Sequence, residues 1–186
     1  MEATMSDEEA DFSLLERWRA GRREAAGELV RRHSALVTNF LRTKAAPEDH
    51  EDLKQEIWEG LLRNQTLKDG SVRAYLLAIA RNVVCAYHKK RNRCTVDPMS
   101  TSMADLDAPL SQQIALRLGS QKLLLALQRM PLDDQTLLEL RYFEEMSTRE
   151  LAVVFAVPDG TIKSRLFNAR KRLEQLLALH PPLPNA

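Results

Sequence analysis

Basic side chains are concentrated in one short stretch near the carboxyl end of the chain. They are Lys163, Arg165, Arg170, Lys171 and Arg172. The nearest acidic residues, Asp159 and Glu174, lie at the ends of the stretch. Lysine and arginine bind phosphate oxygens and guanine edges, which is the chemistry of DNA recognition. A solvated basic helix surface is the ordinary alternative, and periodicity alone does not separate the two interpretations.

Two short helices are predicted to position these cations. Ser147 with Glu150 three residues later forms a capping box, which predicts a helix start. The apolar face of this helix is predicted to contain Leu151, Val154 and Phe155. Pro158 suits the first turn of a second helix, because its missing N–H would be unpaired there. Asp159 places a negative charge near the positive end of that helix.

The second helix is predicted to have two distinct faces. The buried stripe consists of Ile162, Leu166, Ala169, Leu173 and Leu176. The groups that lie away from it are Lys163, Ser164, Phe167, Asn168, Lys171 and Arg172. Two short helices, of which the second carries exposed basic and amide groups, are typical of a helix-turn-helix that enters a DNA major groove.

Length and composition favour an all-α chain with one domain or two small ones. The chain has 186 residues, 44% of them hydrophobic and 28% charged, with 6 glycines and 5% aromatic residues. The net charge is only +1, but charge is segregated along the chain. The acidic start contains Glu2, Asp7, Glu8, Glu9, Asp11 and Glu16. The basic middle contains Arg73, Arg81, Lys89, Lys90, Arg91 and Arg93.

The sequence predicts a cytoplasmic protein without a metal or other cofactor. No apolar run approaches the roughly 20 residues of a membrane span, and no secretory signal pattern is visible. Two cysteines, Cys85 and Cys94, favour a reducing compartment without a disulfide framework. Together with His88 they could be imagined as metal ligands, but their spacing matches no standard zinc pattern.

An amino-terminal helical domain is predicted over 11–93, after a disordered acidic tail at 1–10. Its first helix carries Phe12, Leu15 and Trp18 and ends at Gly21. The second helix, 24–43, has a core face of Leu29, Val30, His33, Leu36, Val37, Phe40 and Leu41, in which His33 is interpreted as a packed histidine. Pro47 opens the third helix. The core stripe of this third helix consists of Leu53, Ile57, Leu61 and Leu62, and its polar face of Asp52, Gln55, Glu56 and Glu59.

A fourth helix follows a break at 67–71. Its predicted core stripe consists of Val72, Tyr75, Leu76, Ile79, Ala80, Val83 and Tyr87. The opposite face is predicted to carry Ala74, Ala78, Arg81, Asn82, Cys85 and Lys89. Small side chains beside a cation and an amide permit close approach of a nucleic-acid strand. The alternative is an ordinary helix with a solvated basic end.

Residues 94–109 break the helical pattern and are predicted to form a flexible linker between domains. A four-helix second domain is predicted over 110–178. Its first helix would begin at about Leu110 and end at Gln128, and its second would run from Pro131 to Phe143. The two helices of the helix-turn-helix complete it. The prolines of 179–186 end helix formation.

Three motifs in this order resemble those of bacterial RNA polymerase sigma factors. They are DLKQEIWEGLL, then VRAYLLAIARNVVCAYHKKRNR, and after the linker LRYFEEMSTRELAVVFAVPDGTIKSRLFNARKRL. The compact two-domain form is similar to the extracytoplasmic-function (ECF) type of the sigma-70 family. The resemblance extends from about Asp11 to Ala178 and is much more specific than a helix-turn-helix alone.

The resemblance implies three binding surfaces. Core RNA polymerase would bind Asp52, Leu53, Gln55 and Glu56. The opened minus-ten promoter element would be held by Lys68, Gly70, Ser71, Arg81, Asn82 and Lys89. The minus-thirty-five element would be read by Thr161, Lys163, Ser164, Arg165, Phe167, Asn168, Lys171 and Arg172. An anti-sigma factor is a further partner of most family members.

Three departures from the family pattern affect the expected behaviour. Ala156 stands where glycine is common, so this turn is expected to be about 1 kcal/mol less favourable. Asn168 stands where arginine is frequent, which leaves the minus-thirty-five sequence open. Val72 and Tyr75 lie where aromatic residues are often found in the melting helix. Fewer stacking groups predict weak intrinsic melting and a need for near-consensus promoters.

Two other classes of function are alternatives to a sigma factor. A stand-alone DNA-binding regulator would use the first domain for a ligand or for dimerisation, and co-purification with core polymerase would separate the two. An enzyme has little support, because the sequence contains no nucleophile–base set, phosphate loop or metal-ligand spacing.

Overall fold

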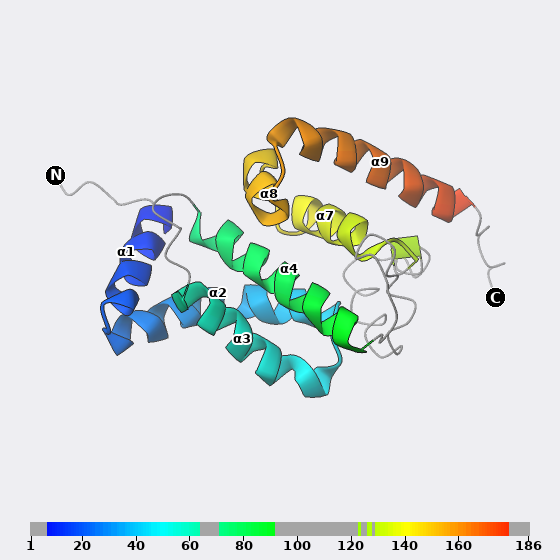
Figure 1. The fold of residues 1–186 in the computed structure, drawn as a ribbon. Coiled ribbons are helices and arrows are strands. Elements are labelled where there is room, and N and C mark those ends of the chain that lie inside the picture. Colours follow the sequence, from blue (N-terminus) through cyan, green and yellow to red (C-terminus); the bar gives the residue numbers. More distant parts are fainter. Residues whose placement is uncertain (1–6, 64–70, 92–122, 124–125, 128, 179–186) are drawn as a thin grey trace, which may run out of the picture. The chain divides into compact units, whose positions relative to one another are not determined.

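The computed structural model describes residues 7–63, 71–91, 123, 126–127 and 129–178. All the secondary-structure elements that these residues form are helices, as predicted (Figure 1). The chain divides into two compact units, residues 1–84 and 85–186, with the division inside α4 (Val72–Arg91). The predicted linker 94–109, the tail 179–186 and most of the loop 67–71 lie outside the described residues.

Of the amino-terminal helices, α2 and α3 begin close to where the sequence predicts, whereas α1 begins earlier. They are α1 (Asp7–Arg19), α2 (Arg23–Arg42), the 3-10 turn η1 (Pro47–Asp49) and α3 (His50–Arg63). Gly21 ends α1 with a φ of 87°. The predicted disordered tail is wrong for residues 7–10, which are helical. Glu8 and Glu9 favour this earlier start, because carboxylates stabilise the positive end of a helix.

The core of the amino-terminal unit is built from the apolar stripes of its helices. Leu15, Leu29, Leu41, Ile57 and Leu61 are fully inaccessible to solvent. The stripes predicted for α2 and α3 are therefore confirmed at their central positions. Trp18 of α1 and Trp58 of α3 add a tilted aromatic pair, with ring centroids 6.4 Å apart.

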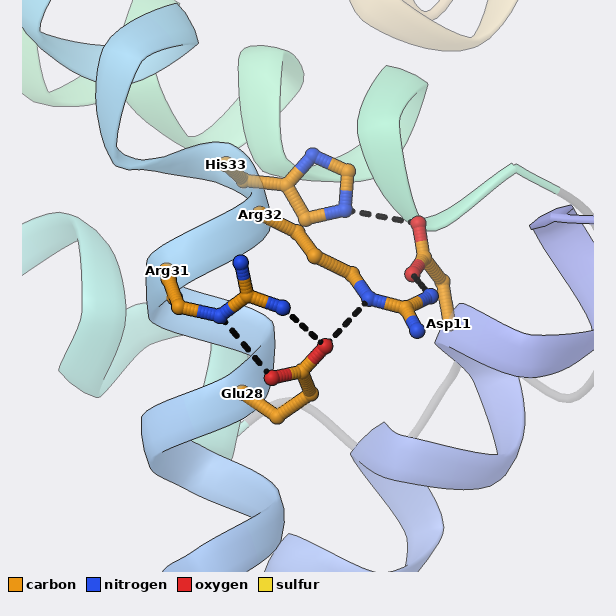
Figure 2. Close-up of polar contacts among 5 residues, drawn as sticks. All are labelled: Asp11, Glu28, Arg31, Arg32 and His33. Carbon is orange, nitrogen blue, oxygen red and sulfur yellow. Dashed lines mark hydrogen bonds and ion pairs between the residues drawn. The ribbon is translucent and has the colours of Figure 1, made fainter.

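A polar network fastens α1 to α2 at the edge of this core (Figure 2). His33 is packed as predicted, and its Nε2 lies 2.7 Å from Oδ2 of the buried Asp11. The other carboxylate oxygen of Asp11 accepts a hydrogen bond from Arg32 at 3.0 Å. Glu28 bridges Arg31 and Arg32. The hydrogen bonds from Arg31, and to a smaller extent those from Arg32, lower the pKa of Glu28 to about 2.

The buried arc of α4 is wider than predicted. Ala74, expected on the open face, is fully buried, and Leu77, Val84 and His88 are buried as well. Three residues of the predicted core stripe, Tyr75, Ile79 and Tyr87, are only half-buried. A helix that is covered on more than one side buries more than a single amphipathic stripe, so periodicity underestimates its core.

Helices α3 and α4 approach each other closely at Gly60. A Cβ atom built on Gly60 would lie 2.9 Å from Cγ2 of Ile79, which is closer than van der Waals contact. By contrast, Gly27, in the interior of α2, has nothing within 4 Å of such a Cβ. Packing therefore requires a glycine at position 60 but leaves room for a larger side chain at position 27.

These contacts predict opposite effects of the same substitution. Gly27→Ala should raise the free energy of unfolding by about 1 kcal/mol through helix propensity. Gly60→Ala gains the same propensity, but forcing the β-branched Ile79 aside costs about 1–3 kcal/mol. Urea unfolding followed by circular dichroism measures both variants. Equal stabilisation by the two substitutions would contradict the close packing at Gly60.

The carboxyl-terminal unit contains α7 (Leu132–Tyr142), α8 (Thr148–Phe155) and α9 (Asp159–Ala178). Each of these helices packs against the other two. Leu137, Leu140, Leu151 and Ile162 are among the buried side chains that they share. The predicted helix between 110 and 128 falls mostly outside the described residues. Within this range Leu123, Ala126 and Leu127 are described, and all three are helical.

Candidate nucleic-acid interface

Helix α8, the first helix of the helix-turn-helix, begins with the predicted capping box. Ser147 Oγ accepts a hydrogen bond from the Glu150 N–H at 3.2 Å, and the Ser147 N–H donates to Glu150 Oε2 at 2.8 Å. At the other end of α8, Ala156 adopts the left-handed conformation, with φ 51° and ψ 45°. Its N–H bonds the carbonyl oxygens of Ala152 and Val153, which ends the helix.

Helix α9 presents the two faces that the sequence predicts. Ile162, Leu166 and Ala169 are buried, and Leu173 and Leu176 are half-buried toward the end of the helix. All the side chains predicted to lie away from the stripe are exposed, as is Arg170, whereas Thr161 and Arg165 are half-buried. The predicted exposed set is Lys163, Ser164, Phe167, Asn168, Lys171 and Arg172. Phe167 is 66% exposed, which is unusual for an aromatic side chain and leaves its ring available to a partner.

Contacts at the start of α9 fix the geometry of its first turn. Ser164 Oγ donates to the Thr161 carbonyl at 2.9 Å, so this hydroxyl is used locally. Lys163 Nζ lies 3.2 Å from Asp159 Oδ2. A hydrogen bond from Thr148, and to a smaller extent one from Lys163, holds the pKa of Asp159 below its ordinary value. Asp159 thereby ties the start of α9 to α8.

Further along α9, two arginines contact α7. Arg172 forms an ion pair with Asp134, and the Arg170 guanidinium lies 5.5 Å from the ring centroid of Tyr142. Asp134 and Tyr142 are not among the residues that the sequence predicts for this surface. No local signal could have identified Asp134, because its partner is 38 residues away.

The acidic face predicted on α3 is exposed in the structure. Asp52, Gln55 and Glu56 are exposed, while Leu53 is buried beneath them. Gln55 Nε2 donates to Glu59 Oε1 at 2.9 Å, and Glu59 also pairs with Arg63. Within the described part of the chain, no ion pair of Asp52 or Glu56 is found.

The residues predicted to hold the minus-ten element are only partly described. Ser71 Oγ accepts a hydrogen bond from the Ala74 N–H at 3.2 Å and so caps α4. Asn82 and Lys89 are exposed, and Arg81 is half-buried with an interaction partner. Lys68 and Gly70 lie outside the described residues.

Two properties of the described residues bear on other functions. None of the described helices is long and apolar enough to cross a membrane. Likewise, the described histidines, cysteines and carboxylates form no group that could hold a metal ion. Of the imagined ligand set, Cys94 lies outside these residues, while His88 is buried and Cys85 half-buried.

Known protein families match both units. Residues 29–94 match the family model for sigma-70 region 2, and residues 120–173 match that for sigma-70 region 4. The ECF RNA polymerase sigma factor RpoE of Cereibacter sphaeroides is 30% identical over 179 residues, covering 91% of this chain and 96% of that protein.

Solved structures share the fold. CnrH, solved with the cytosolic domain of CnrY, matches with a TM-score of 0.65 and 21% identity over 92% of this chain and 99% of that one. The sigma factor RpoE of Bartonella quintana, solved with the anti-sigma factor NepR, matches with a TM-score of 0.58 and 23% identity, covering 86% and 99% of the two chains.

The left-handed residue in the turn before α9 generates a stability prediction. Ala156→Gly should raise the free energy of unfolding of the carboxyl-terminal unit by about 1 kcal/mol, because glycine adopts this conformation without the Cβ clash. Ala152→Gly, inside α8, is the matched control and should lower it by about 1 kcal/mol. Urea titrations of both variants test this. A loss of stability in Ala156→Gly would argue against the left-handed turn.

Proposed function

The chain belongs to the ECF RNA polymerase sigma factors, and from this membership we propose a partner for each of its exposed surfaces. As a member of this family it binds core RNA polymerase and directs promoter-specific transcription initiation. Membership also excludes the stand-alone regulator. The observation that carries the assignment of surfaces is the exposed basic and amide face of α9, which lies over a buried apolar stripe in a helix-turn-helix.

The exposed face of α9 is proposed to read the minus-thirty-five element. Lys163, Ser164 and Phe167 lie in the amino-terminal half of the helix, which enters the groove deepest in this motif. Thr161, Arg165 and Asn168 flank them. Lys171 lies about three turns beyond the start of α9 at Asp159, where it would meet phosphates and not bases. Arg172 is the exception, since it is already paired with Asp134.

Helix α4 is proposed to hold the minus-ten strand. Asn82 and Lys89 are exposed along it, with Arg81 half-buried beside Asn82. An amide can read one base edge, while cations bind the backbone. Lys68, Gly70 and Ser71, at and before the start of α4, are proposed to complete this surface.

The acidic face of α3 is proposed to bind core polymerase. Asp52 and Glu56 are exposed on it without ion-pair partners among the described residues, and Gln55 lies between them. Leu53 is buried below this face and anchors the helix instead of contacting the partner directly. Exposed carboxylates on a rigid helix suit a basic protein surface.

The protein is further proposed to act in the cytoplasm, without catalytic activity of its own and under the control of an anti-sigma factor. Its family consists of transcription initiation factors, and Bartonella quintana RpoE was solved with its anti-sigma factor. No residue of this chain identifies the anti-sigma factor. Mapping transcript starts after overexpression would define the promoters.

The surface of α3 gives a test of core binding. The double substitution Asp52→Lys and Glu56→Lys should weaken association with core polymerase at least 10-fold, because like charges would then face each other. Glu24→Lys, an exposed acid in the first turn of α2, is the matched control and should bind normally. Fluorescence titration with core enzyme measures all three proteins. Wild-type affinity of the double variant would remove α3 from the interface.

The face of α9 gives a test that separates positioning from reading. Lys171→Ala should lower binding to every minus-thirty-five variant by a similar factor, because a phosphate contact carries no sequence information. Lys163→Ala should instead flatten the preference at one or two positions. Holoenzyme containing the full chain is titrated with a promoter library at two salt concentrations. The reverse assignment of the two effects would show that α9 docks differently.

A further inference from the structure

The ion pair between Arg172 and Asp134 connects the DNA-facing helix to the helix behind it. Arg172 Nη1 donates to Asp134 Oδ2, and the partners come from α9 and from the first turn of α7. The Asp134 side chain is only 15% exposed, whereas that of Arg172 is 50% exposed. The cation therefore reaches from the surface toward a largely covered carboxylate.

A second ion pair on α9 provides the contrast. Lys163 and Asp159 are four residues apart on one helix, and their side chains are 67% and 40% exposed. Exposed pairs of this kind contribute about 0–1 kcal/mol and exchange readily for another partner. Lys163 is therefore free to leave Asp159 when a base edge or phosphate approaches.

The Asp134 carboxylate, which pairs with Arg172, lies in a different environment from that of Asp159. Burial raises the pKa of its carboxyl, and the neighbouring Asp133 acts in the same direction, while Arg172 and then Arg165 oppose them. Removing Arg172 would leave a largely covered carboxylate without its hydrogen-bonded cation, which is more costly than breaking a surface pair. The carboxylate thus retains Arg172 more strongly than Asp159 retains Lys163.

We propose that Asp134 is a positioning residue that holds Arg172 on the protein and so limits sequence-independent DNA binding by α9. This inference rests on the proposed function, in which α9 faces the minus-thirty-five element. Lys171, which has no ion-pair partner among the described residues, supplies the phosphate contact at this end of the helix. The neighbouring Arg172 adds none, although its sequence position resembles that of Lys171.

The salt dependence of binding reports this difference. Each phosphate contact contributes about 0.9 to the slope of log affinity against log salt. A released Arg172 would add one contact, so affinity would fall about 3- to 4-fold more between 50 and 200 mM salt. A merely structural ion pair would change stability without steepening the slope.

The test uses the full chain assembled with core polymerase and a duplex of a promoter defined by transcript mapping. Salt titrations compare the wild type with Asp134→Ala, Arg172→Ala and the double variant. Asp134→Ala should steepen the slope by about 0.9. Arg172→Ala alone should leave the wild-type slope unchanged, and in the double variant it should abolish the increase.

Two controls separate other causes. Glu174→Ala removes the same charge from the exposed surface of α9, two residues beyond Arg172, and should steepen the slope far less than Asp134→Ala. Lys171→Ala should lower the wild-type slope by about 0.9 if α9 lies on DNA. If Asp134→Ala does not fold by circular dichroism, Asp134→Asn replaces it, with an increase in the same direction.

Two results would overturn the inference. One is a lower slope in Arg172→Ala, which would mean that Arg172 already contacts phosphate. The other is an unchanged slope in the Asp134 variants. If Lys171→Ala lowers the slope in either case, only the role of Asp134 has failed. If Lys171→Ala has no effect, the docking of α9 proposed above has failed, and the inference fails with it.

Discussion

The burial of one side of α9 is the constraint on which the DNA-facing surface depends. Ile162, Leu166 and Ala169 are packed against α7 and α8. Each large apolar side chain contributes about 1.5–3 kcal/mol when it is removed from water. Successive residues of a helix are rotated by about 100°, so turning α9 by one position would expose this stripe and bury Lys163 or Phe167 instead. The packing of the stripe therefore decides which side chains a DNA groove would meet.

The basic side chains on the exposed face of α9 differ in how strongly their acidic partners hold them, and this depends on how exposed each carboxylate is. Asp159 is solvated and holds Lys163 weakly, whereas Asp134 is largely covered and holds Arg172 firmly. The basic residues of α9 are therefore not equivalent, although the sequence presents them as one cluster. A positive charge on the surface contributes to DNA affinity only where it has no better partner on the protein itself.

In the amino-terminal unit, too, the burial of an apolar stripe decides which charged side chains face outward, but here these charges are negative. Leu53, Ile57 and Leu61 anchor α3, and this anchoring turns Asp52 and Glu56 outward. The net charge of +1 thus averages over surfaces of opposite sign, each suited to a different partner. The Asp11–His33 contact fixes α1 on α2 and belongs neither to the acidic face of α3 nor to the basic face of α9.

The sequence by itself determined the features that depend on residues within about one helical turn of each other. The capping box of Ser147 and Glu150, the stripe of α9 and the acidic face of α3 follow from local hydrogen bonding and from the helical period. Composition predicted the all-α fold, and three motifs in order along the chain carried the resemblance to sigma factors.

Only the tertiary structure decided the features that depend on distant partners. The buried state of Ala74 reflects coverage of α4 on more than one side, which the 3.6-residue period cannot reveal. Asp11 meets His33 across 22 residues, and Asp134 meets Arg172 across 38. Such pairs form because packed helices bring them together, and no pattern within either helix specifies the partner. For that reason the sequence predicted which face of α9 is basic, while the fold decided which of its cations is already paired.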